Sequence, residues 1–126
     1  MKIKKSGLII VLVVMIITFY GGAALADKSA TAIEAPDQVA EGAEITVKIH
    51  VTHRGNSFAH YTNWVKVLVD GNEVALWQYS ANNRPENAKF TREIKLIINK
   101  STEIVAESSC NLHGGDKPSK KTITLK

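Results

Sequence analysis

The one cysteine of the chain, Cys110, lies three residues before His113 in a Cys-Asn-Leu-His-Gly segment. A tight turn over this spacing brings a thiolate and an imidazole to the same side, where both can bind one ion. Thiolate and imidazole ligands suit iron, copper or zinc, whereas calcium and magnesium prefer oxygen ligands. The alternative for Cys110 is a small buried apolar side chain, which is the usual environment of a free cysteine.

The other three histidines, His50, His53 and His60, lie within eleven positions of one another. His53 and His60 flank a glycine-containing loop, where capping of that loop is the alternative to metal binding. His50 alternates with apolar residues and is expected on the polar face of a strand, exposed to solvent. The Cys110–His113 pair together with this histidine-rich loop predicts that the chain binds a transition metal.

The elements that must position these residues are predicted to be β-strands. Apolar and polar residues alternate over residues 44–51, which is typical of a strand with one buried face. Asp70-Gly71 is a strong two-residue hairpin signal. Further strands are expected at residues 64–69, 73–79, 90–98, 103–108 and 122–125, and residues 27–33 are expected to be a flexible lead-in. Short strands between turn signals predict an all-β fold, an immunoglobulin-like antiparallel β-sandwich of about seven strands.

The first 26 residues are predicted to be a signal peptide. Three lysines precede an apolar run at residues 8–19, and Ala24-Leu25-Ala26 has the small-x-small pattern of a cleavage site. Residues 27–126 would then form one domain, exported to the periplasm or otherwise outside the cytoplasm. The alternative is an uncleaved membrane anchor, because about 20 apolar residues are enough to cross a bilayer. Contact with a membrane is expected only through such an uncleaved leader.

The charge and the cysteine content limit the classes of function. The chain has 16 basic and 12 acidic residues, and removal of the leader leaves 13 basic residues and a net charge of +1. A net charge of +1 does not indicate the clustered basic face that nucleic-acid binding needs. A single cysteine cannot form an internal disulfide, although exported domains of this size often have them. The Cys110 thiol is therefore expected to be buried, paired with another chain or bound to a metal.

Two segments of the chain resemble a known family. The segment Cys-Asn-Leu-His-Gly that begins at Cys110 is similar to the Cys-Asn-x-His-Gly signature of superoxide reductases, the desulfoferrodoxin and neelaredoxin family. The segment His-Tyr-Thr-Asn-Trp-Val that begins at His60, followed by Asp70-Gly71, resembles a strand and hairpin of that family. His53 matches the histidine that opens the same loop. The resemblance covers residues 34–125.

The resemblance implies a mononuclear non-haem iron on an immunoglobulin-like sandwich. Cys110 would be the axial thiolate ligand, and His53, His60 and His113 would be equatorial ligands. The implied activity is reduction of superoxide to hydrogen peroxide, with superoxide bound at the open sixth position of the iron. The resemblance also implies an external electron donor, which reduces the iron again after each turnover.

The chain departs from the family at an early Lys-His-x-Pro segment. The matching place is residues 33–36, Ile-Glu-Ala-Pro, which have neither the histidine nor the lysine. Water, Glu34 or His50 would then complete the iron ligands. Arg54 or Lys117 would replace the lysine whose positive charge attracts superoxide.

Two other functions remain as alternatives to an enzyme. A small exported β-sandwich with a Cys-x-x-His loop and an upstream histidine also describes an electron carrier of the blue-copper type. The chain after the leader has no methionine, however, so the usual axial thioether of copper is missing. The third alternative is a non-catalytic sandwich domain that binds a protein partner.

Overall fold

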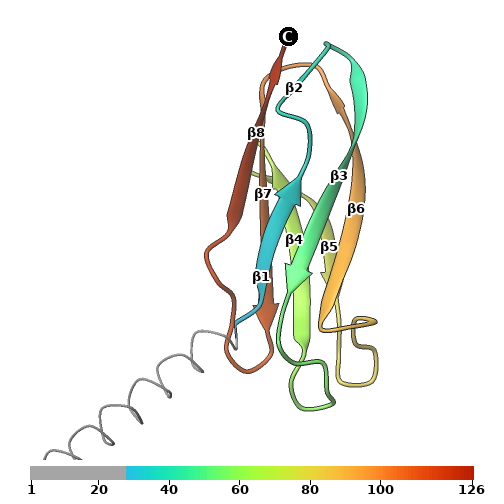
Figure 1. Cartoon of the computed structure of the whole chain (residues 1–126), viewed down its shortest axis with the longest axis vertical. Helices are drawn as coiled ribbons and strands as arrows, with labels where there is room; N and C mark the ends of the chain where they lie inside the picture. The colour runs from blue at the N-terminus through green and yellow to red at the C-terminus, as the bar shows by residue number, and fades with distance from the viewer. Residues whose placement is uncertain (1–27) are drawn as a thin grey trace, which may run out of the picture.

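The computed structural model describes residues 28–126, which form two β-sheets packed as a sandwich (Figure 1). One sheet has three strands in the order β1-β3-β6, and the other has five in the order β2-β8-β7-β4-β5. The strands of this described part are β1 (Ala30–Glu34), β2 (Gln38–Val39), β3 (Ala43–Thr52), β4 (Thr62–Val69), β5 (Asn72–Gln78), β6 (Lys89–Ile98), β7 (Thr102–Cys110) and β8 (Ser119–Leu125). The predicted all-β class is confirmed. The predicted signal peptide lies outside the described residues.

The apolar core lies between the two sheets and follows from the alternation along each strand. In β3, Ile45, Val47, Ile49 and Val51 are buried, while the residues between them point away from the core. The facing sheet contributes the buried side chains Val65, Val67, Ile104, Ala106 and Ile123. Full burial of such a side chain contributes about 1.5 to 3 kcal/mol. This core fixes the strand ends from which the candidate site residues extend.

The expectation of a flexible lead-in at residues 27–33 is wrong for most of that segment. Residues Ala30–Glu34 form β1, which pairs antiparallel with β3, with Ile33 opposite Ile49. The segment contains a single large apolar residue, so its own pattern is weak, and the pairing with β3 supplies its hydrogen bonds. The two-residue strand β2 was also not predicted, and its pairing with β8 is parallel. The described part therefore has eight strands instead of about seven.

Arg92 joins β6 to the loop between β5 and β6. Its guanidinium donates two hydrogen bonds to the Glu86 carboxylate, at 3.0 and 2.7 Å, and its Nε donates to the Tyr79 hydroxyl at 2.8 Å. The guanidinium carbon lies 4.7 Å from the centroid of the Phe90 ring. The two bonds from Arg92 lower the pKa of Glu86 to about 2. This cluster holds the β5–β6 loop against the edge of the sandwich.

Three loops and the start of β1 meet at the lower end of the sandwich in Figure 1, opposite the carboxyl terminus. These loops join β3 to β4, β5 to β6 and β7 to β8. The Asn56 side chain donates to the carbonyl of Pro85 at 2.9 Å, and the Ser29 amide donates to the carbonyl of Gly114 at 3.3 Å. This end of the molecule therefore brings together segments that are far apart in the sequence.

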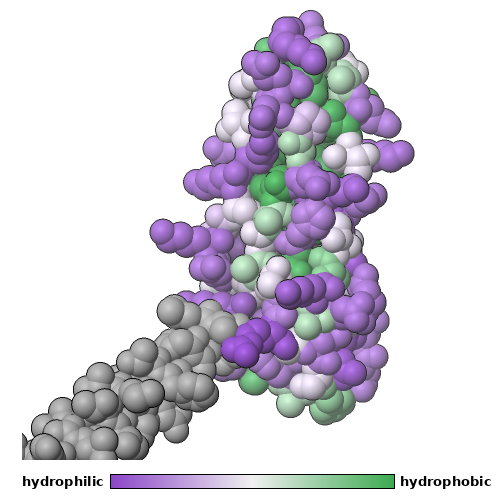
Figure 2. Space-filling view, in the orientation of Figure 1, coloured by the Kyte–Doolittle hydropathy of each residue, from purple (hydrophilic) through white to green (hydrophobic). Residues whose placement is uncertain are grey.

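The molecular face in Figure 2 is mostly hydrophilic, with separate apolar patches along its length. The exposed large apolar side chains among residues 28–126 include Phe58, Val74, Leu76, Ile97 and Leu112. Over the same residues, the structure has no helix with the length and apolar character needed to cross a membrane.

Candidate metal centre

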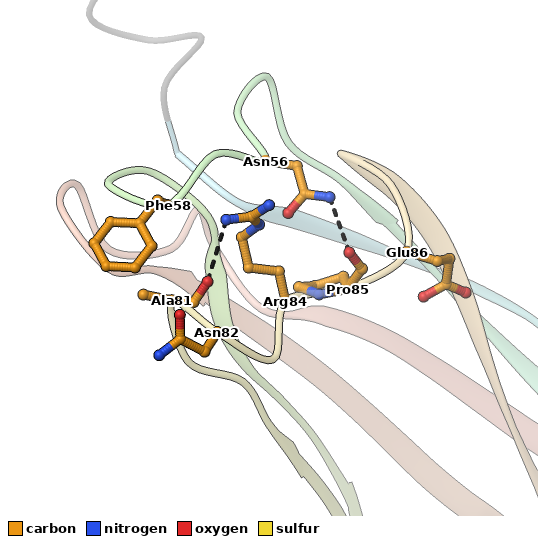
Figure 3. A pocket seen from close by; sticks show the side chains of 7 residues that line it. All are labelled: Asn56, Phe58, Ala81, Asn82, Arg84, Pro85 and Glu86. Carbon is orange, nitrogen blue, oxygen red and sulfur yellow. Dashed lines mark hydrogen bonds between the residues drawn. The ribbon is translucent and has the colours of Figure 1, made fainter.

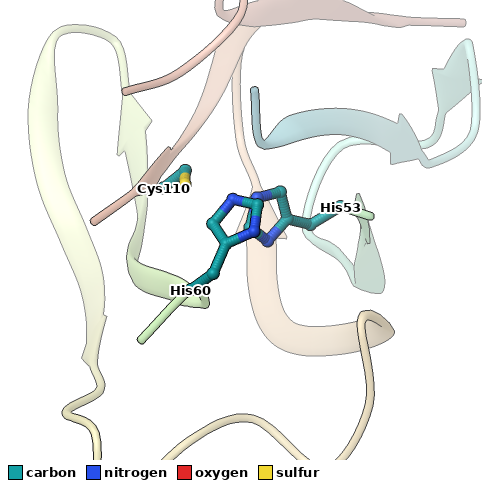
Figure 4. Close-up of side chains that lie close together, drawn as sticks. All are labelled: His53, His60 and Cys110. Atoms are coloured by element: carbon teal, nitrogen blue, oxygen red, sulfur yellow. The ribbon is translucent and has the colours of Figure 1, made fainter. Parts of the chain in front are cut away.

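His53, His60 and Cys110 form a compact group of metal-ligating side chains at the loop end of the sandwich (Figure 4). His53 follows β3, His60 precedes β4, and Cys110 is the last residue of β7. One ligand atom from each residue lies within 4.8 Å of the other two. Bonds of about 2.0 to 2.3 Å place two ligands of one ion up to about 4.5 Å apart. A small inward shift of the side chains would therefore let all three bind one ion.

The burial of these residues also fits a metal site. Cys110 and His53 are each 2 % exposed, and His60 is half-buried. The Nε2 atom of His60 is buried and has no hydrogen-bond partner among residues 28–126. A buried polar atom without a partner costs about 1 to 3 kcal/mol. A metal ion at this position would remove that cost, so the donor set fits a thiolate- and imidazole-bound transition metal.

His113 lies at the exposed rim of the same group. Its Nδ1 is 3.8 Å from the Cys110 sulfur, and its ring centroid is 5.1 Å from that of His60. The ring centroid of His53 is 4.7 Å from that of His60. Both ring pairs are nearly perpendicular, with interplanar angles of 82°. The His60 ring is therefore in contact with both of the other imidazoles.

A tight turn after β7 brings His113 back toward Cys110. The Cys110 amide donates to the carbonyl of Gly114 at 2.9 Å, and the Gly114 amide donates to the carbonyl of Cys110 at 3.1 Å. Gly114 has a φ of 72°, a conformation that glycine adopts without steric cost. A Cβ on Gly115 would lie 2.0 Å from the carbonyl oxygen of Ser108, so the chain can pass there only as glycine. The Cys-x-x-His-Gly-Gly sequence thus matches the turn it forms.

The Cys110 sulfur accepts a hydrogen bond from the backbone amide of Leu112, at 3.4 Å. The turn therefore fixes the position of the sulfur at the end of β7. The thiolate is the form of cysteine that binds metals.

The loop before β4 holds His60 against Gly55. A Cβ on Gly55 would lie 2.4 Å from Nδ1 of His60, so the imidazole rests directly on the glycine backbone. Ser57 and His60 exchange two backbone hydrogen bonds, at 2.8 and 3.1 Å, and close a turn between them. Sequence reasoning treated Gly55 only as a loop marker. Its position between two candidate histidines is the signal for a close backbone approach.

His50 and Glu34 lie outside this group, on the outer face of the three-stranded sheet. Nδ1 of His50 is 2.9 Å from the Thr91 hydroxyl, and its Nε2 is 3.7 Å from the Glu34 carboxylate. Their suggested role as additional ligands stays a prediction, as does the full ligand set. Arg54 and Lys117, the suggested attracting charges, are both exposed in loops at the site end.

A separate depression of about 390 Å³ lies beside the β5–β6 loop (Figure 3). Within it, the Arg84 guanidinium donates to the carbonyl of Ala81 at 3.1 Å. Its lining residues are Asn56, Phe58, Ala81, Asn82, Arg84, Pro85 and Glu86. None of the four candidate ligands lines this depression, so it lies apart from the group of His53, His60 and Cys110.

Comparison with known proteins gives both family and structural matches. The sequence model of the Desulfoferrodoxin family matches residues 22–117. The superoxide reductase (neelaredoxin) from Ignicoccus hospitalis is 25 % identical, with 77 % of this chain and 80 % of that chain covered and a TM-score of 0.63. A candidate superoxide reductase from Thermotoga maritima is 27 % identical, with coverage of 79 % and 88 % and a TM-score of 0.58.

A third structural match concerns the fold alone. The sulfur carrier protein SoxY from Chlorobium limicola f thiosulfatophilum is 13 % identical, with 76 % of this chain and 78 % of that chain covered and a TM-score of 0.57. A search of the curated proteins found no match. This match therefore supports the sandwich fold and nothing further.

Proposed function

Because the chain belongs to the desulfoferrodoxin family, we propose that it is a superoxide reductase that reduces superoxide to hydrogen peroxide at a mononuclear non-haem iron. The observation that carries this proposal is the convergence of His53, His60 and Cys110 at one end of the sandwich, with donor atoms within 4.8 Å. The sequence resemblance at Cys110 and His60 supports the same assignment. An unidentified electron donor completes the proposed reaction, because each turnover consumes one electron.

Four side chains would hold the iron: the Cys110 thiolate and the imidazoles of His53, His60 and His113. When bound, the iron supplies the electron that superoxide takes up, and two protons complete hydrogen peroxide. Cys110 and His53 are buried, whereas His113 is exposed, so the rim near His113 is the open side for the substrate. The exposed cations Arg54 and Lys117 lie in two of the three loops of this end, the β3–β4 and β7–β8 loops. Positive charge there would raise the local concentration of the superoxide anion.

We also propose that the chain is exported, as the leader sequence predicts, with cleavage after Ala26. An uncleaved leader that tethers the domain to a membrane is the alternative. The first residue of the protein recovered from the periplasm separates the two. Asp27 at the amino terminus supports cleavage, and a chain that begins at Met1 contradicts it.

We infer further that the sandwich is of the immunoglobulin type. In a constant-type immunoglobulin domain, strands A, B, E and D form one sheet and strands C, F and G form the other. Here β1-β3-β6 correspond to A, B and E, and β8-β7-β4 correspond to G, F and C. The strands β2 and β5 extend the second sheet at its two edges.

The proposed function is tested by metal content and visible absorption. We expect one iron per purified chain and a thiolate charge-transfer band that bleaches on reduction and returns when superoxide is added. Cys110→Ser and His113→Ala should each abolish the metal-dependent colour, because each removes a proposed ligand. His50→Ala is the control and should keep the colour. A protein that binds iron but does not reoxidise with superoxide would contradict the activity and leave the metal site intact.

The same three-donor group also favours one second candidate function. Two histidines and one cysteine are the strong ligands of a blue-copper electron carrier. Stoichiometric copper with an intense thiolate-to-copper band would support this carrier and contradict the iron enzyme. The absence of methionine from residues 27–126 of the sequence argues against it, because the usual axial thioether is missing. A colourless chain that takes up neither iron nor copper would contradict both functions. The remaining alternative would be a non-catalytic sandwich domain that binds a protein partner.

A further inference from the structure

The side chain of Asn111 holds the backbone on both sides of His60. The Tyr61 amide donates to Oδ1 of Asn111 at 2.9 Å, and Nδ2 of Asn111 donates to the carbonyl of Ala59 at 3.0 Å. Ala59 and Tyr61 are the immediate neighbours of His60. A third hydrogen bond runs from the backbone amide of Asn111 to the carbonyl of Tyr61, at 3.0 Å. Both hydrogen bonds between this side chain and the backbone therefore lie next to one candidate ligand.

Asn111 also follows Cys110 directly in the chain. Its side-chain amide therefore connects the segment that carries the proposed thiolate to the segment that carries the His60 imidazole. Gly55 supports the opposite side of the His60 ring, where any Cβ would overlap with Nδ1. His60 is thus fixed by glycine on one side and by the Asn111 amide on its flanking peptides. Neither residue has a ligand atom in the group of His53, His60 and Cys110.

We propose that Asn111 is a positioning residue of the metal site: it sets the His60 imidazole at a defined distance from the Cys110 sulfur before any ion binds. This inference rests on one part of the proposed function, namely that the group of His53, His60 and Cys110 binds a transition metal. Residues that orient metal ligands typically change metal affinity by about 10- to 100-fold when mutated. The loss arises because an unrestrained ligand must be ordered when the ion binds.

A purely structural role would stabilise the turn without acting through His60, and a double-mutant cycle separates the two roles. The cycle compares the affinity of the metal-free protein for Co²⁺ in wild type, Asn111→Ala, His60→Ala and the double variant. We expect Asn111→Ala to weaken Co²⁺ binding about tenfold in the wild-type background. In the His60→Ala background, the same change should have no further effect, because the ligand that it positions is gone. An equal loss in both backgrounds would overturn the proposal.

Asn56→Ala is the matched control for a lost side-chain amide. Asn56 donates to the carbonyl of Pro85 at 2.9 Å and so also ties the loop of His60 to another loop, but it does not flank His60. We expect its Co²⁺ affinity to stay within about threefold of wild type, as for substitutions away from special features. An equal loss of affinity in Asn56→Ala and Asn111→Ala would mean that any loosening of these loops has the same effect, and would overturn the proposal.

The imidazole signals of the metal-free protein give a second readout that needs no metal. In Asn111→Ala, the ring signals of His60 should shift and broaden in the NMR spectrum, while those of the distant His50 stay unchanged. Unchanged His60 signals would overturn the proposal, and this readout can be used even if the wild-type chain binds no Co²⁺. Failure of the wild-type chain to bind Co²⁺ would by itself contradict the metal site. Asn111→Asp, which keeps the acceptor for the Tyr61 amide, replaces Asn111→Ala should the latter not fold.

Discussion

At the scale of single residues, the tightest constraints of the metal centre meet at His60. Its ring centroid lies 4.7 Å from that of His53 and 5.1 Å from that of His113. Its Nδ1 faces the backbone of Gly55, and its buried Nε2 has no hydrogen-bond partner in the described part of the chain. The ring therefore has little freedom to move without leaving the group of ligands.

Gly55→Ala should displace the His60 ring and weaken metal binding. The added methyl group would lie 2.4 Å from Nδ1 and 2.9 Å from Cε1 of His60. Because such overlap forces the ring or the loop to move, we expect metal affinity to fall about tenfold or more. Overpacking of this kind also costs about 1 to 3 kcal/mol of unfolding free energy. Metal titration and denaturant unfolding of the metal-free protein measure the two effects.

Gly71→Ala is the control for Gly55→Ala. Gly71 has a φ of 85°, and a Cβ there would meet nothing within 4 Å. Alanine is strained in this conformation, so Gly71→Ala should lower stability without lowering metal affinity. Wild-type metal affinity in Gly55→Ala would contradict the role given to the glycine.

The candidate ligands could be named from the sequence, whereas the residues that hold them could not. Cys110 and His113 stand out through their spacing, and His53 and His60 through their loop. Gly55 contacts the His60 ring with its own backbone, and Asn111 bonds the backbone on both sides of His60, 50 and 52 positions away in the sequence. Neither residue type nor spacing shows which backbone a ring will contact, so these two roles are visible only in the structure.

At the scale of the elements, the start of β1 is joined to the sheet that carries the site. Ser29 is buried, and its hydroxyl lies 3.0 Å from the Thr62 hydroxyl and 2.8 Å from the Ser108 hydroxyl. Thr62 begins β4, and Ser108 lies near the end of β7. The carbonyl of Ser29 also accepts a hydrogen bond from the Asp116 amide at 2.9 Å. This contact secures β4 and β7 close to the ends that carry His60 and Cys110.

Ser29→Ala should lower the free energy of unfolding by about 1 to 3 kcal/mol, because it removes a hydroxyl shared by two other buried hydroxyls. Urea denaturation of the metal-free protein measures this change. The control is Ser80→Ala at an exposed loop position, which should change stability by less than about 0.5 kcal/mol. Equal losses of unfolding free energy in the two variants would show that the buried hydroxyl cluster stabilises the fold no more than an exposed loop serine does.

Six of the eight described strands were predictable from alternation, but their ends were not. The strand predicted at residues 103–108 extends to Cys110, because Cys110 pairs with Thr62 on β4. This extension places the sulfur at the strand end and not in a free loop. The strands β1 and β2 were missed, since each depends on pairing with a partner far away in the sequence. Local patterns therefore located the strands, and long-range pairing determined where they end.

At the scale of the whole molecule, acid stability should depend on the pair formed by Glu86 and Arg92. The pKa of Glu86 is lowered from 4.5 to about 2, chiefly by its hydrogen bonds from Arg92. A lowered pKa in the folded state means that the carboxylate stabilises the fold above pH 4.5. This contribution is lost as the pH falls from 4.5 through about 2, and below that pH Glu86 is protonated in both states.

Glu86→Gln should therefore be less stable than wild type at pH 6, and the difference should shrink between about pH 4.5 and pH 2. The Glu86 side chain is 56 % exposed, so solvent screening limits the difference to about 1 kcal/mol or less. Denaturant unfolding of both proteins over this pH range measures it, and added salt should reduce it. A difference that stays constant down to pH 2 would contradict the assignment.

The candidate ligands come from both layers of the sandwich. His53 follows β3 of the three-stranded sheet, whereas His60 precedes β4 and Cys110 ends β7, both strands of the other sheet. An ion bound there would cross-link the two sheets of a chain whose single cysteine rules out an internal disulfide. A ligand at about 1,000 times its Kd stabilises the folded state by about 4 kcal/mol. Proteases that cut opened chains would then remove unloaded copies first, so the ion would set the lifetime of the protein as well as its chemistry.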